Sequence, residues 1–354
     1  HHDMKIVYTP IHGTGLKLIP RSLANYGFTN IIGVPEQEVL SGDFPTVASP
    51  NPEEPSAMAM AIEKAKETGA EVVMASDPDA DRIGLVIRDN NGEYVLINGN
   101  QIVMIFLNYL MTRNTELGTL TGNEYIVKTI VTTETIRTIA EAQHIKMYDC
   151  FTGFKWIANV MRENEGKARY LGGGEESYGF LAEDFVRDKD SVSAISLMAE
   201  IAAWAKDKGL NMTDMLIDIY MKYGFSREKG ISLVRKGKSG AEEIIALMKQ
   251  FRENPPKEIA GSPVVTVKDF QSLVETNVAT GETKKLDMPA TSNVLQYYTA
   301  DRTKVSVRPS GTEPKIKFYI EVHDTLASAD EYKATEARAD EKIGRIAKEF
   351  GITK

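Results

Sequence analysis

The sequence has a single cysteine, Cys150, among its 354 residues, which excludes a disulfide framework. A reducing compartment fits this absence, so we expect a cytoplasmic protein in which Cys150 is a small buried side chain and not a nucleophile. No apolar run approaches the roughly 18 residues of a membrane span, and no secretory leader is visible. We therefore expect no membrane partner.

Basic residues are outnumbered, since 42 Lys and Arg stand against 50 Asp and Glu for a net charge of −8. This balance argues against a nucleic-acid partner, which would need a basic face. The five histidines show no metal-ligand spacing. The motifs Gly-x-Ser-x-Gly and Gly-x4-Gly-Lys-Ser/Thr are both missing, which excludes serine hydrolases and P-loop ATPases.

The length predicts two or three domains, and the 42% apolar and 26% charged fractions are those of an ordinary globular protein. Residues 4–91 alternate predicted strands and helices, and residues 92–225 repeat the alternation. This predicts α/β domains with parallel strands and ligands at the carboxyl ends of those strands. Residues 226–354 change to strands and two helices, which predicts an antiparallel α+β domain.

Local signals add further expectations. Residues 35–55 form a long, proline-rich loop. Ser56 is expected to cap the following helix, which Gly69 should end. In the last segment we expect a polar excursion between strands at 264–267 and 304–307.

Three carboxylates, Asp77, Asp79 and Asp81, follow a short apolar run at every second position. In an extended loop, side chains spaced by two residues point the same way, so these three would converge. Converging carboxylates repel unless a cation lies between them, and their oxygens suit a hard ion such as Mg²⁺ or Ca²⁺. The alternative is an acidic turn that caps a helix.

A second polar stretch, at residues 308–315, lies between two predicted strands. Arg308 can make paired hydrogen bonds to a phosphate, and Ser310 and Thr312 offer hydroxyls. Gly311 would let the backbone aim successive N–H groups inward as an anion-binding nest. The alternative is a polar hairpin with glycine at its tip.

A third stretch, Gly-Glu-Glu-Ser-Tyr-Gly at residues 174–179, predicts a flexible loop at a strand end. The carboxylates of Glu175 and Glu176 and the hydroxyl of Ser177 suit the vicinal hydroxyls of a sugar. The alternative is a solvated turn.

Two lysines and one histidine are further candidates. Lys155 follows Gly153 at a helix start, where it could bind a phosphate with help from the helix N-terminus. Lys128 lies inside an apolar strand, so it either reaches the cleft or makes an ion pair. His12 is expected to be a structural loop histidine.

These stretches in this order resemble the phosphohexomutase superfamily, specifically its phosphoglucomutase branch, over nearly the whole chain. The motifs that carry the resemblance lie at residues 9–15, 77–82, 174–179 and 308–312. The resemblance implies two α/β domains with mixed sheets and then a smaller α+β domain resembling the TATA-binding-protein fold. The corresponding segments are 4–91, 92–225 and 226–354.

The resemblance also implies a reaction, the interconversion of glucose 1-phosphate and glucose 6-phosphate through a phosphoserine and a glucose 1,6-bisphosphate intermediate. It assigns Mg²⁺ to the three aspartates and contact with the phosphoserine to Arg82. The sugar hydroxyls would be held by Glu175, Glu176 and Ser177. The phosphate that is not transferred would be held by Arg308, Ser310, Gly311 and Thr312. Lys128 and Lys155 would face the transferring oxygen or a phosphate.

The family's nucleophile is a serine in a Thr-Ala-Ser-His-Asn-Pro-like loop, and no such loop occurs here. Ser49 lies in the nearest string but belongs to the long loop, so it is not assigned this role. The start, from His1 to Met4, reads as a tag remnant. We therefore expect the chain to lack the serine domain, to bind its sugar phosphate weakly and to be inactive alone.

Other readings stay open from the sequence. A phosphopentomutase or phosphomannomutase shares much of the pattern, and a non-catalytic sugar-phosphate-binding module is possible. Asp77-Pro78-Asp79 also resembles the nucleophile motif of haloacid-dehalogenase phosphatases. That motif follows the first strand of its fold, whereas here the third predicted strand precedes it, so this reading is disfavoured. The sequence does not indicate the oligomeric state.

Overall fold

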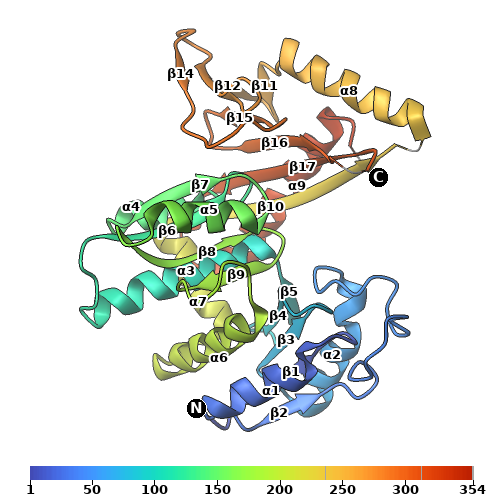
Figure 1. Cartoon of the computed structure of the whole chain (residues 1–354), viewed down its shortest axis with the longest axis vertical. Helices are drawn as coiled ribbons and strands as arrows, with labels where there is room; N and C mark the ends of the chain where they lie inside the picture. Colours follow the sequence, from blue (N-terminus) through green and yellow to red (C-terminus); the bar gives the residue numbers. More distant parts are fainter. Residues whose placement is uncertain (236, 312, 353–354) are drawn as a thin grey trace. The chain divides into compact units, whose positions relative to one another are not determined.

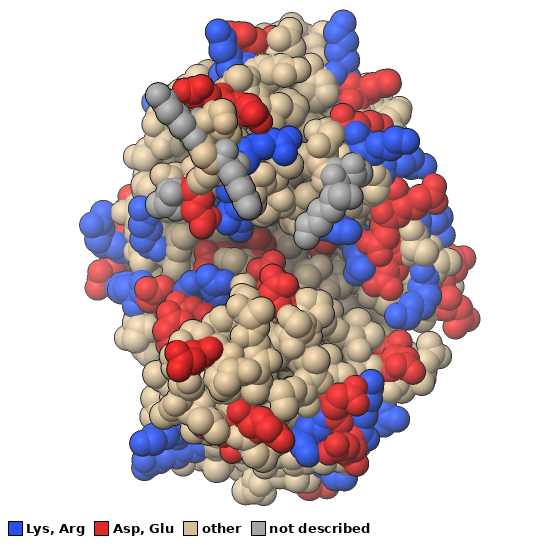
Figure 2. Space-filling model, turned by 90° about the vertical axis from the view of Figure 1, so that its right-hand side faces the viewer, with Lys and Arg blue, Asp and Glu red and all other residues tan. Residues whose placement is uncertain are grey.

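The computed structural model describes residues 1–235, 237–311 and 313–352 (Figure 1). It divides into two compact units, His1–Ile219 and Tyr220–Lys354. In these described ranges no helix combines the length and the apolar character that a membrane crossing requires. On the face drawn in Figure 2, acidic and basic side chains are interspersed.

The first unit holds a five-stranded sheet in the order β2-β1-β3-β4-β5. Its strands are β1 (Ile6–Thr9), β2 (Ile31–Gly33), β3 (Val72–Ser76), β4 (Ile83–Arg88) and β5 (Tyr94–Ile97). β1 pairs in parallel with β2 and β3, whereas β4 and β5 run antiparallel. The parallel arrangement predicted for the first three strands is confirmed, and β4 adds an antiparallel partner because it follows β3 after only the acidic turn. Without a crossover helix, a strand can only return antiparallel.

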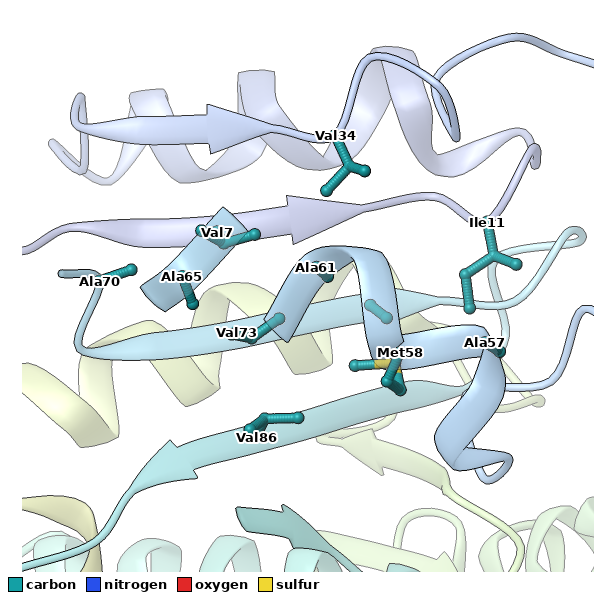
Figure 3. Close-up of a cluster of buried hydrophobic side chains, with 11 residues drawn as sticks. Val7, Ile11, Val34, Ala57, Met58, Ala61, Ala65, Ala70, Val73 and Val86 are labelled. Atoms are coloured by element: carbon teal, nitrogen blue, oxygen red, sulfur yellow. The ribbon is translucent and has the colours of Figure 1, made fainter. Parts of the chain in front are cut away.

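Helix α2 (Pro55–Thr68) packs on this sheet through small side chains. Ala57, Ala61 and Ala65 belong to one buried cluster with Val7 and Val73, as Figure 3 shows. Alanines on the inner face let the helix lie close to the strands. The sheet and helix thereby form a rigid support for the loops at the strand ends.

The two ends of α2 test the expected caps. The helix begins at Pro55 with Glu54 as its N-cap residue, so the expected cap at Ser56 is wrong. Proline suits the first helical position because its missing N–H is not needed there. At the other end Gly69 has a φ of 66°, which confirms the predicted glycine stop.

A second sheet in the first unit has the order β7-β6-β8-β9. Its strands are β6 (Glu124–Thr129), β7 (Lys146–Cys150), β8 (Arg169–Glu175) and β9 (Gly179–Ala182). The first three are parallel and β9 is antiparallel, so both sheets are mixed, as the family resemblance implies. Cys150 is 1% exposed at the end of β7, which confirms its predicted burial.

The remaining helices of this part of the chain are α1 (Gly15–Asn25), α3 (Gly99–Glu116), α4 (Thr135–Ala142), α5 (Phe154–Asn164), α6 (Ser191–Asp207) and α7 (Met212–Tyr223). α1 contacts α6, where Ser22 Oγ lies 2.8 Å from Ser196 Oγ. The two sheets therefore share one compact unit. The division of that unit into segments 4–91 and 92–225 stays a prediction.

The second unit is built on an antiparallel sheet in the order β10-β17-β16-β15-β12-β13-β14, with β11 paired to β12. Its strands are β10 (Phe225–Val234), β11 (Glu258–Ile259), β12 (Ser262–Asp269), β13 (Val274–Asn277), β14 (Thr283–Lys285), β15 (Leu295–Thr299), β16 (Lys304–Pro309) and β17 (Lys315–Asp324). Its helices are α8 (Gly237–Glu253), the short η1 (Ala329–Glu331) and α9 (Tyr332–Glu349).

The predicted α+β arrangement of this unit is confirmed, and the segment expected to be a polar excursion forms further strands. That segment contains β13, β14 and β15. All three residues of β14 are exposed, so the hairpin shows no polar–apolar alternation in sequence. The likeness to the TATA-binding-protein fold stays a prediction.

Candidate phosphoryl-transfer site

The three aspartates lie in the turn that follows β3 and precedes β4. Their carboxylates approach one another as predicted, with ligand atoms of Asp77, Asp79 and Asp81 all within 4.8 Å. Ala80 has a φ of 60°, a left-handed conformation that tightens the turn between the second and third carboxylates. The donors are all carboxylate oxygens, which suit a hard divalent cation.

Asp77 is the innermost member of this group and is 7% exposed. Its Oδ1 accepts hydrogen bonds from the backbone N–H of Asp81 at 3.0 Å and of Arg82 at 2.9 Å. Burial raises the pKa of Asp77 to about 7, and the neighbouring Asp81 and Asp79 add to the shift against these hydrogen bonds. A cation between the carboxylates would relieve that repulsion, so the residues fit a bound Mg²⁺.

Arg82 follows the aspartates and partly neutralises them. Its Nε lies 3.5 Å from Asp77 Oδ2 and 3.9 Å from Asp81 Oδ1. The side chain is 32% exposed. It therefore pairs with the carboxylates and still reaches solvent, which fits the expected contact with a phosphorylated group.

The loop at residues 9–15 supports the carboxylate turn through its backbone. The N–H and hydroxyl of Thr14 both donate to the carbonyl of Pro78, at 2.8 and 3.0 Å. A Cβ on Gly13 would lie only 2.3 Å from Pro78 Cα, so a larger residue would displace the turn. Below it, Tyr8 Oη lies 2.9 Å from Ser76 Oγ. The turn is therefore held by the sheet beneath it.

His12 is buried in this supporting loop. Its Nδ1 lies 2.8 Å from the carbonyl oxygen of Val39, and its Nε2 lies 2.8 Å from Thr46 Oγ1. Both ring nitrogens thus hold the long loop at residues 35–55. The expectation of a structural histidine agrees with these contacts.

Residues 174–179 form a tight hairpin between β8 and β9, and not the flexible loop expected. β8 extends to Glu175, which pairs with Gly179 across the turn. Tyr178 has a φ of 71° and is buried. Burial raises the pKa of Tyr178, with Glu53 and Glu54 adding to the shift. Hydrogen bonding along the strand pair therefore fixes the turn.

The hairpin lies directly beside the carboxylate turn. The backbone N–H of Ile83 donates to the carbonyl of Tyr178 at 3.0 Å, and Arg82 pairs with Gly179 as an antiparallel bridge. These bonds join the two sheets of the first unit at their functional ends. The turn with the predicted metal ligands and the hairpin with the predicted sugar-binding residues therefore lie side by side.

Lys189 connects the same two loops, and the sequence analysis missed it. Its Nζ lies 3.4 Å from Asp81 Oδ2 and 3.3 Å from Glu175 Oε1. The side chain is 14% exposed. The available signal was its place in Arg187-Asp188-Lys189-Asp190, a charged run between the hairpin and the start of α6.

The structure places Lys128 in the ion-pair alternative and not at a substrate surface. Its side chain is 0% exposed, and its Nζ lies 2.9 Å from both Glu134 Oε1 and Asp149 Oδ1. The expectation that it faces a transferring oxygen is not met in this geometry. The charge of Lys128 is instead compensated by Glu134, the N-cap residue of α4, and by Asp149 in β7.

Lys155, by contrast, is exposed in the first turn of α5, after Gly153 with its φ of 102°. Its Nζ lies 5.6 Å from the ring centroid of Trp156. The side chain remains accessible to an anion.

The expected phosphate-binding stretch lies in the second unit, between β16 and β17. Arg308 and Ser310 are half-buried and Gly311 is exposed, whereas Thr312 lies outside the described residues. The N–H of Ser310 donates to the carbonyl of Lys315 at 2.7 Å, so this N–H does not point into the expected nest. Ser310 Oγ accepts from the N–H of Glu313 at 3.3 Å.

A cavity of about 580 Å³ adjoins this stretch within the second unit. It is lined by Pro309, Ser310, Gly311, Glu313 and Pro314 together with residues of α8. Ser310 and Gly311 therefore border a space large enough for a phosphate group.

Comparison with known proteins agrees with this arrangement. Three models of the phosphoglucomutase/phosphomannomutase family match the chain in order: alpha/beta/alpha domain II at residues 1–92, alpha/beta/alpha domain III at 98–223 and the C-terminal domain at 255–348. A phosphoglucomutase of Staphylococcus haemolyticus is 35% identical over 321 residues, which are 91% of this chain and 58% of that protein. One from Staphylococcus epidermidis is 36% identical over 318 residues, 90% of this chain and 57% of that protein. The chain thus spans somewhat more than half the length of these relatives.

Solved structures share the fold at low sequence identity. Parafusin from Paramecium, a phosphoglucomutase, matches with a TM-score of 0.65 and 17% identity over 98% of this chain and 58% of that one. A family protein from Burkholderia thailandensis matches with a TM-score of 0.62 and 19% identity over 99% of this chain and 61% of that one. An N-acetylphosphoglucosamine mutase of Aspergillus fumigatus, solved with glucose 1,6-bisphosphate, matches with a TM-score of 0.50 and 13% identity over 98% of this chain and 61% of that one.

Successive family models thus cover most of the chain, and relatives about 35% identical align over nine tenths of it. The chain belongs to the phosphoglucomutase/phosphomannomutase family, within the phosphohexomutase superfamily.

Proposed function

We propose that this chain forms part of an enzyme that interconverts glucose 1-phosphate and glucose 6-phosphate by Mg²⁺-dependent phosphoryl transfer, with a phosphoserine and glucose 1,6-bisphosphate as intermediates. One observation carries the proposal. Three converging carboxylates lie directly against a hairpin that presents two carboxylates and a hydroxyl. A cation site beside a sugar-diol site is what transfer of a phosphoryl group to a sugar hydroxyl requires.

Asp77, Asp79 and Asp81 are the residues that would hold Mg²⁺. When bound there, Mg²⁺ would polarise the transferring phosphoryl group and offset the charge that develops on it. Arg82 would contact the phosphoserine. Its guanidinium already pairs with Asp77, so it is oriented before any ligand arrives.

Binding of the sugar falls to the hairpin. The Glu176 carboxylate would accept hydrogen bonds from adjacent sugar hydroxyls, and the Ser177 hydroxyl would donate or accept one. Glu175 would lie beside them. Arg308, Ser310, Gly311 and Thr312 would bind the phosphate that is not transferred, and Lys155 is available to a phosphate. The hairpin would bind the adjacent hydroxyls in both orientations of the bisphosphate. Either phosphate could then reach the serine.

Lys189 would hold the carboxylate turn and the hairpin in fixed positions relative to each other. Its ammonium lies between Asp81 and Glu175, at 3.4 and 3.3 Å. It compensates part of the negative charge that gathers where the turn and the hairpin meet. A residue in this position can also bind an anionic oxygen of the substrate without a large movement.

The chain alone is proposed to bind sugar phosphates without turning them over. The phosphoserine loop of the family has no counterpart in its sequence. A cytoplasmic location remains part of the proposal, in keeping with the single cysteine. A phosphopentomutase or phosphomannomutase activity is the alternative substrate assignment, and a non-catalytic binding module is the alternative role.

Calorimetric titration of the chain with glucose 6-phosphate, mannose 6-phosphate and ribose 5-phosphate, each with Mg²⁺ present, tests the proposal. We expect glucose 6-phosphate to bind most tightly. Arg308→Ala should weaken it by about tenfold or more, because a charge-assisted hydrogen bond is lost. Arg345→Ala is the matched control, since Arg345 is 57% exposed and pairs only weakly with Glu341.

Two results would overturn the proposal. One is the absence of measurable binding of any of the three sugar phosphates to the unmodified chain. The other is an affinity for glucose 6-phosphate that Arg308→Ala leaves unchanged. A preference for ribose 5-phosphate or mannose 6-phosphate would instead reassign the substrate and keep the reaction class.

A further inference from the structure

Lys128 is the buried member of an ion cluster at the end of β6. Its Nζ lies 2.9 Å from Glu134 Oε1 and 2.9 Å from Asp149 Oδ1. Arg137 closes the ring, with its Nε 2.9 Å from Glu134 Oε2 and its Nη2 against Asp149 Oδ2. Two cations and two carboxylates balance, so the buried ammonium of Lys128 is compensated while Arg137 reaches solvent.

The same ammonium shapes the loop that follows β6. Nζ lies 3.4 Å from the carbonyl oxygen of Thr129 and 3.3 Å from that of Thr132. The chain therefore curls around the lysine between these two residues. Both threonine side chains are 0% exposed, and their hydroxyl oxygens lie 2.9 Å apart.

The paired hydroxyls converge on one carboxylate oxygen of the hairpin. Thr129 Oγ1 lies 3.0 Å from Glu176 Oε2, and Thr132 Oγ1 lies 3.3 Å from the same atom. A carboxylate accepts hydrogen bonds, and the two hydroxyls are the donors in these contacts. The side chain of Glu176 is thus tied to the loop around Lys128.

The backbone of the hairpin turn is fixed from another side. A Cβ on Gly99 would lie 1.9 Å from the carbonyl oxygen of Glu176, so the first residue of α3 packs against the turn. The next residue, Asn100, accepts the N–H of Thr133 through its Oδ1 at 2.9 Å. The first turn of α3 therefore holds both the hairpin and the loop that carries the threonines.

We infer that Thr129 and Thr132, held in place by the Lys128 ion cluster, are positioning residues that orient the Glu176 carboxylate toward the hydroxyls of the sugar. This inference rests on the proposed function, in which Glu176 binds those hydroxyls. A carboxylate fixed through one oxygen has less rotational freedom to lose when the sugar binds. The buried lysine then acts through the loop and not by contact with phosphate.

Removal of the two donors tests the inference on the chain itself. Thr129→Val and Thr132→Val keep the shape of the side chain and remove the hydroxyl. Each should weaken the calorimetric affinity for glucose 1-phosphate by about five- to tenfold, because the Glu176 carboxylate keeps only one of its two hydroxyl donors and must be ordered when the sugar binds. Thr129→Ser keeps the donor and should retain most of the affinity.

Thr135→Val is the matched control. Thr135 is 1% exposed in the first turn of α4, and among the described residues its Oγ1 has no hydrogen-bond partner. Its replacement should leave the affinity for glucose 1-phosphate unchanged. A purely structural effect of placing valine in this region would appear in the control as well.

Two further readouts separate positioning from a general loss of structure. Binding of inorganic phosphate should be the same in Thr129→Val and in the unmodified chain. With a glucose 1-phosphate analogue that lacks the 3- and 4-hydroxyls, Thr129→Val should lose no affinity relative to the unmodified chain. In a Glu176→Ala background, Thr129→Val should cause no further loss.

The inference would be overturned if Thr129→Val and Thr132→Val bind glucose 1-phosphate as the unmodified chain does. An equal loss for inorganic phosphate, or a full additional loss in the Glu176→Ala background, would also overturn it. If the unmodified chain binds no glucose 1-phosphate, the proposed function itself has failed and the inference fails with it. Should Thr129→Val not fold, the comparison of Thr132→Val with Thr135→Val decides the question.

Discussion

The carboxylate turn at residues 77–82 and the arginine loop at residues 308–311 hold charged groups in opposite ways. The turn is enclosed by its own unit, where Thr14, Gly13 and the hairpin contact it on several sides. The arginine loop is open, and a Cβ on Gly311 would meet nothing within 4 Å among the described atoms. The proposed cation site is therefore built in advance, whereas the proposed phosphate site is left accessible.

Physical chemistry accounts for the difference. Three carboxylates repel one another, so their convergence must be enforced by backbone hydrogen bonds and close packing. An arginine and a hydroxyl on a loop carry no such repulsion and can adjust to the anion as it binds. This contrast predicts that substitutions in the turn change the free energy of unfolding strongly, whereas substitutions in the loop change it weakly.

The largest effect should follow from Gly13→Ala. The new Cβ would lie 2.3 Å from Pro78 Cα and 2.7 Å from the Pro78 carbonyl oxygen, so the turn must move. We expect the free energy of unfolding to fall by about 3 kcal/mol, measured by urea denaturation. Gly311→Ala is the matched control and should change the stability by less than about 0.5 kcal/mol. Equal effects at the two glycines would remove the contrast between the loops.

Asp81→Asn should lower the affinity of the chain for Mg²⁺ by about tenfold or more, because one of three charged ligands is lost. Isothermal titration with MgCl₂ measures the change. The affinity for inorganic phosphate should not fall, since the proposed anion site belongs to the second unit. Asp43→Asn, on an exposed stretch of the same unit, should leave Mg²⁺ binding unaltered. A parallel loss in Asp43→Asn would show that only long-range charge is being measured.

Tyr8→Phe should have an intermediate effect on the turn. The buried hydroxyl of Tyr8 lies 2.9 Å from Ser76 Oγ, and its loss leaves the serine without this partner. We expect the free energy of unfolding to fall by about 1 kcal/mol. Tyr26→Phe should have no effect on stability, because Tyr26 is 63% exposed. Indistinguishable melting curves for Tyr8→Phe and the unmodified chain would contradict the supporting role of β1.

The smallest effect is expected for Ser310→Ala. Its hydroxyl accepts a hydrogen bond from the N–H of Glu313 within the loop, and in the proposed site it would contact the anion. Titration with glucose 6-phosphate should show an affinity lowered by roughly threefold, with stability unchanged. A loss of stability comparable to that of Tyr8→Phe would show that the loop is as firmly built as the turn.

Part of this architecture could be predicted from the sequence because the signals were local. The alternation of three carboxylates after an apolar strand indicated their convergence, and Gly69 marked the end of α2. The burial of Cys150 followed from its apolar character. Each of these features depends on neighbours within a few residues.

The parts that could not be predicted depend on distant partners. The direction of β4 is set by its pairing with β3, and the short polar strand β14 is held by its antiparallel pairing with β13. Lys128 was expected to be either in a cleft or in an ion pair, and the choice is made by Glu134 and Asp149. Lys189 was missed because its partners Asp81 and Glu175 lie far from it in sequence.

A coupled enzyme assay tests whether this chain holds the cation and sugar sites of a mutase but not its nucleophile. Glucose 1-phosphate, Mg²⁺ and a trace of glucose 1,6-bisphosphate are added to the chain, and glucose 6-phosphate is detected through a coupled dehydrogenase. We expect calorimetric binding of glucose 1-phosphate together with no NADPH formation above the protein-free blank. Sustained NADPH formation at a rate proportional to the concentration of the chain would contradict it.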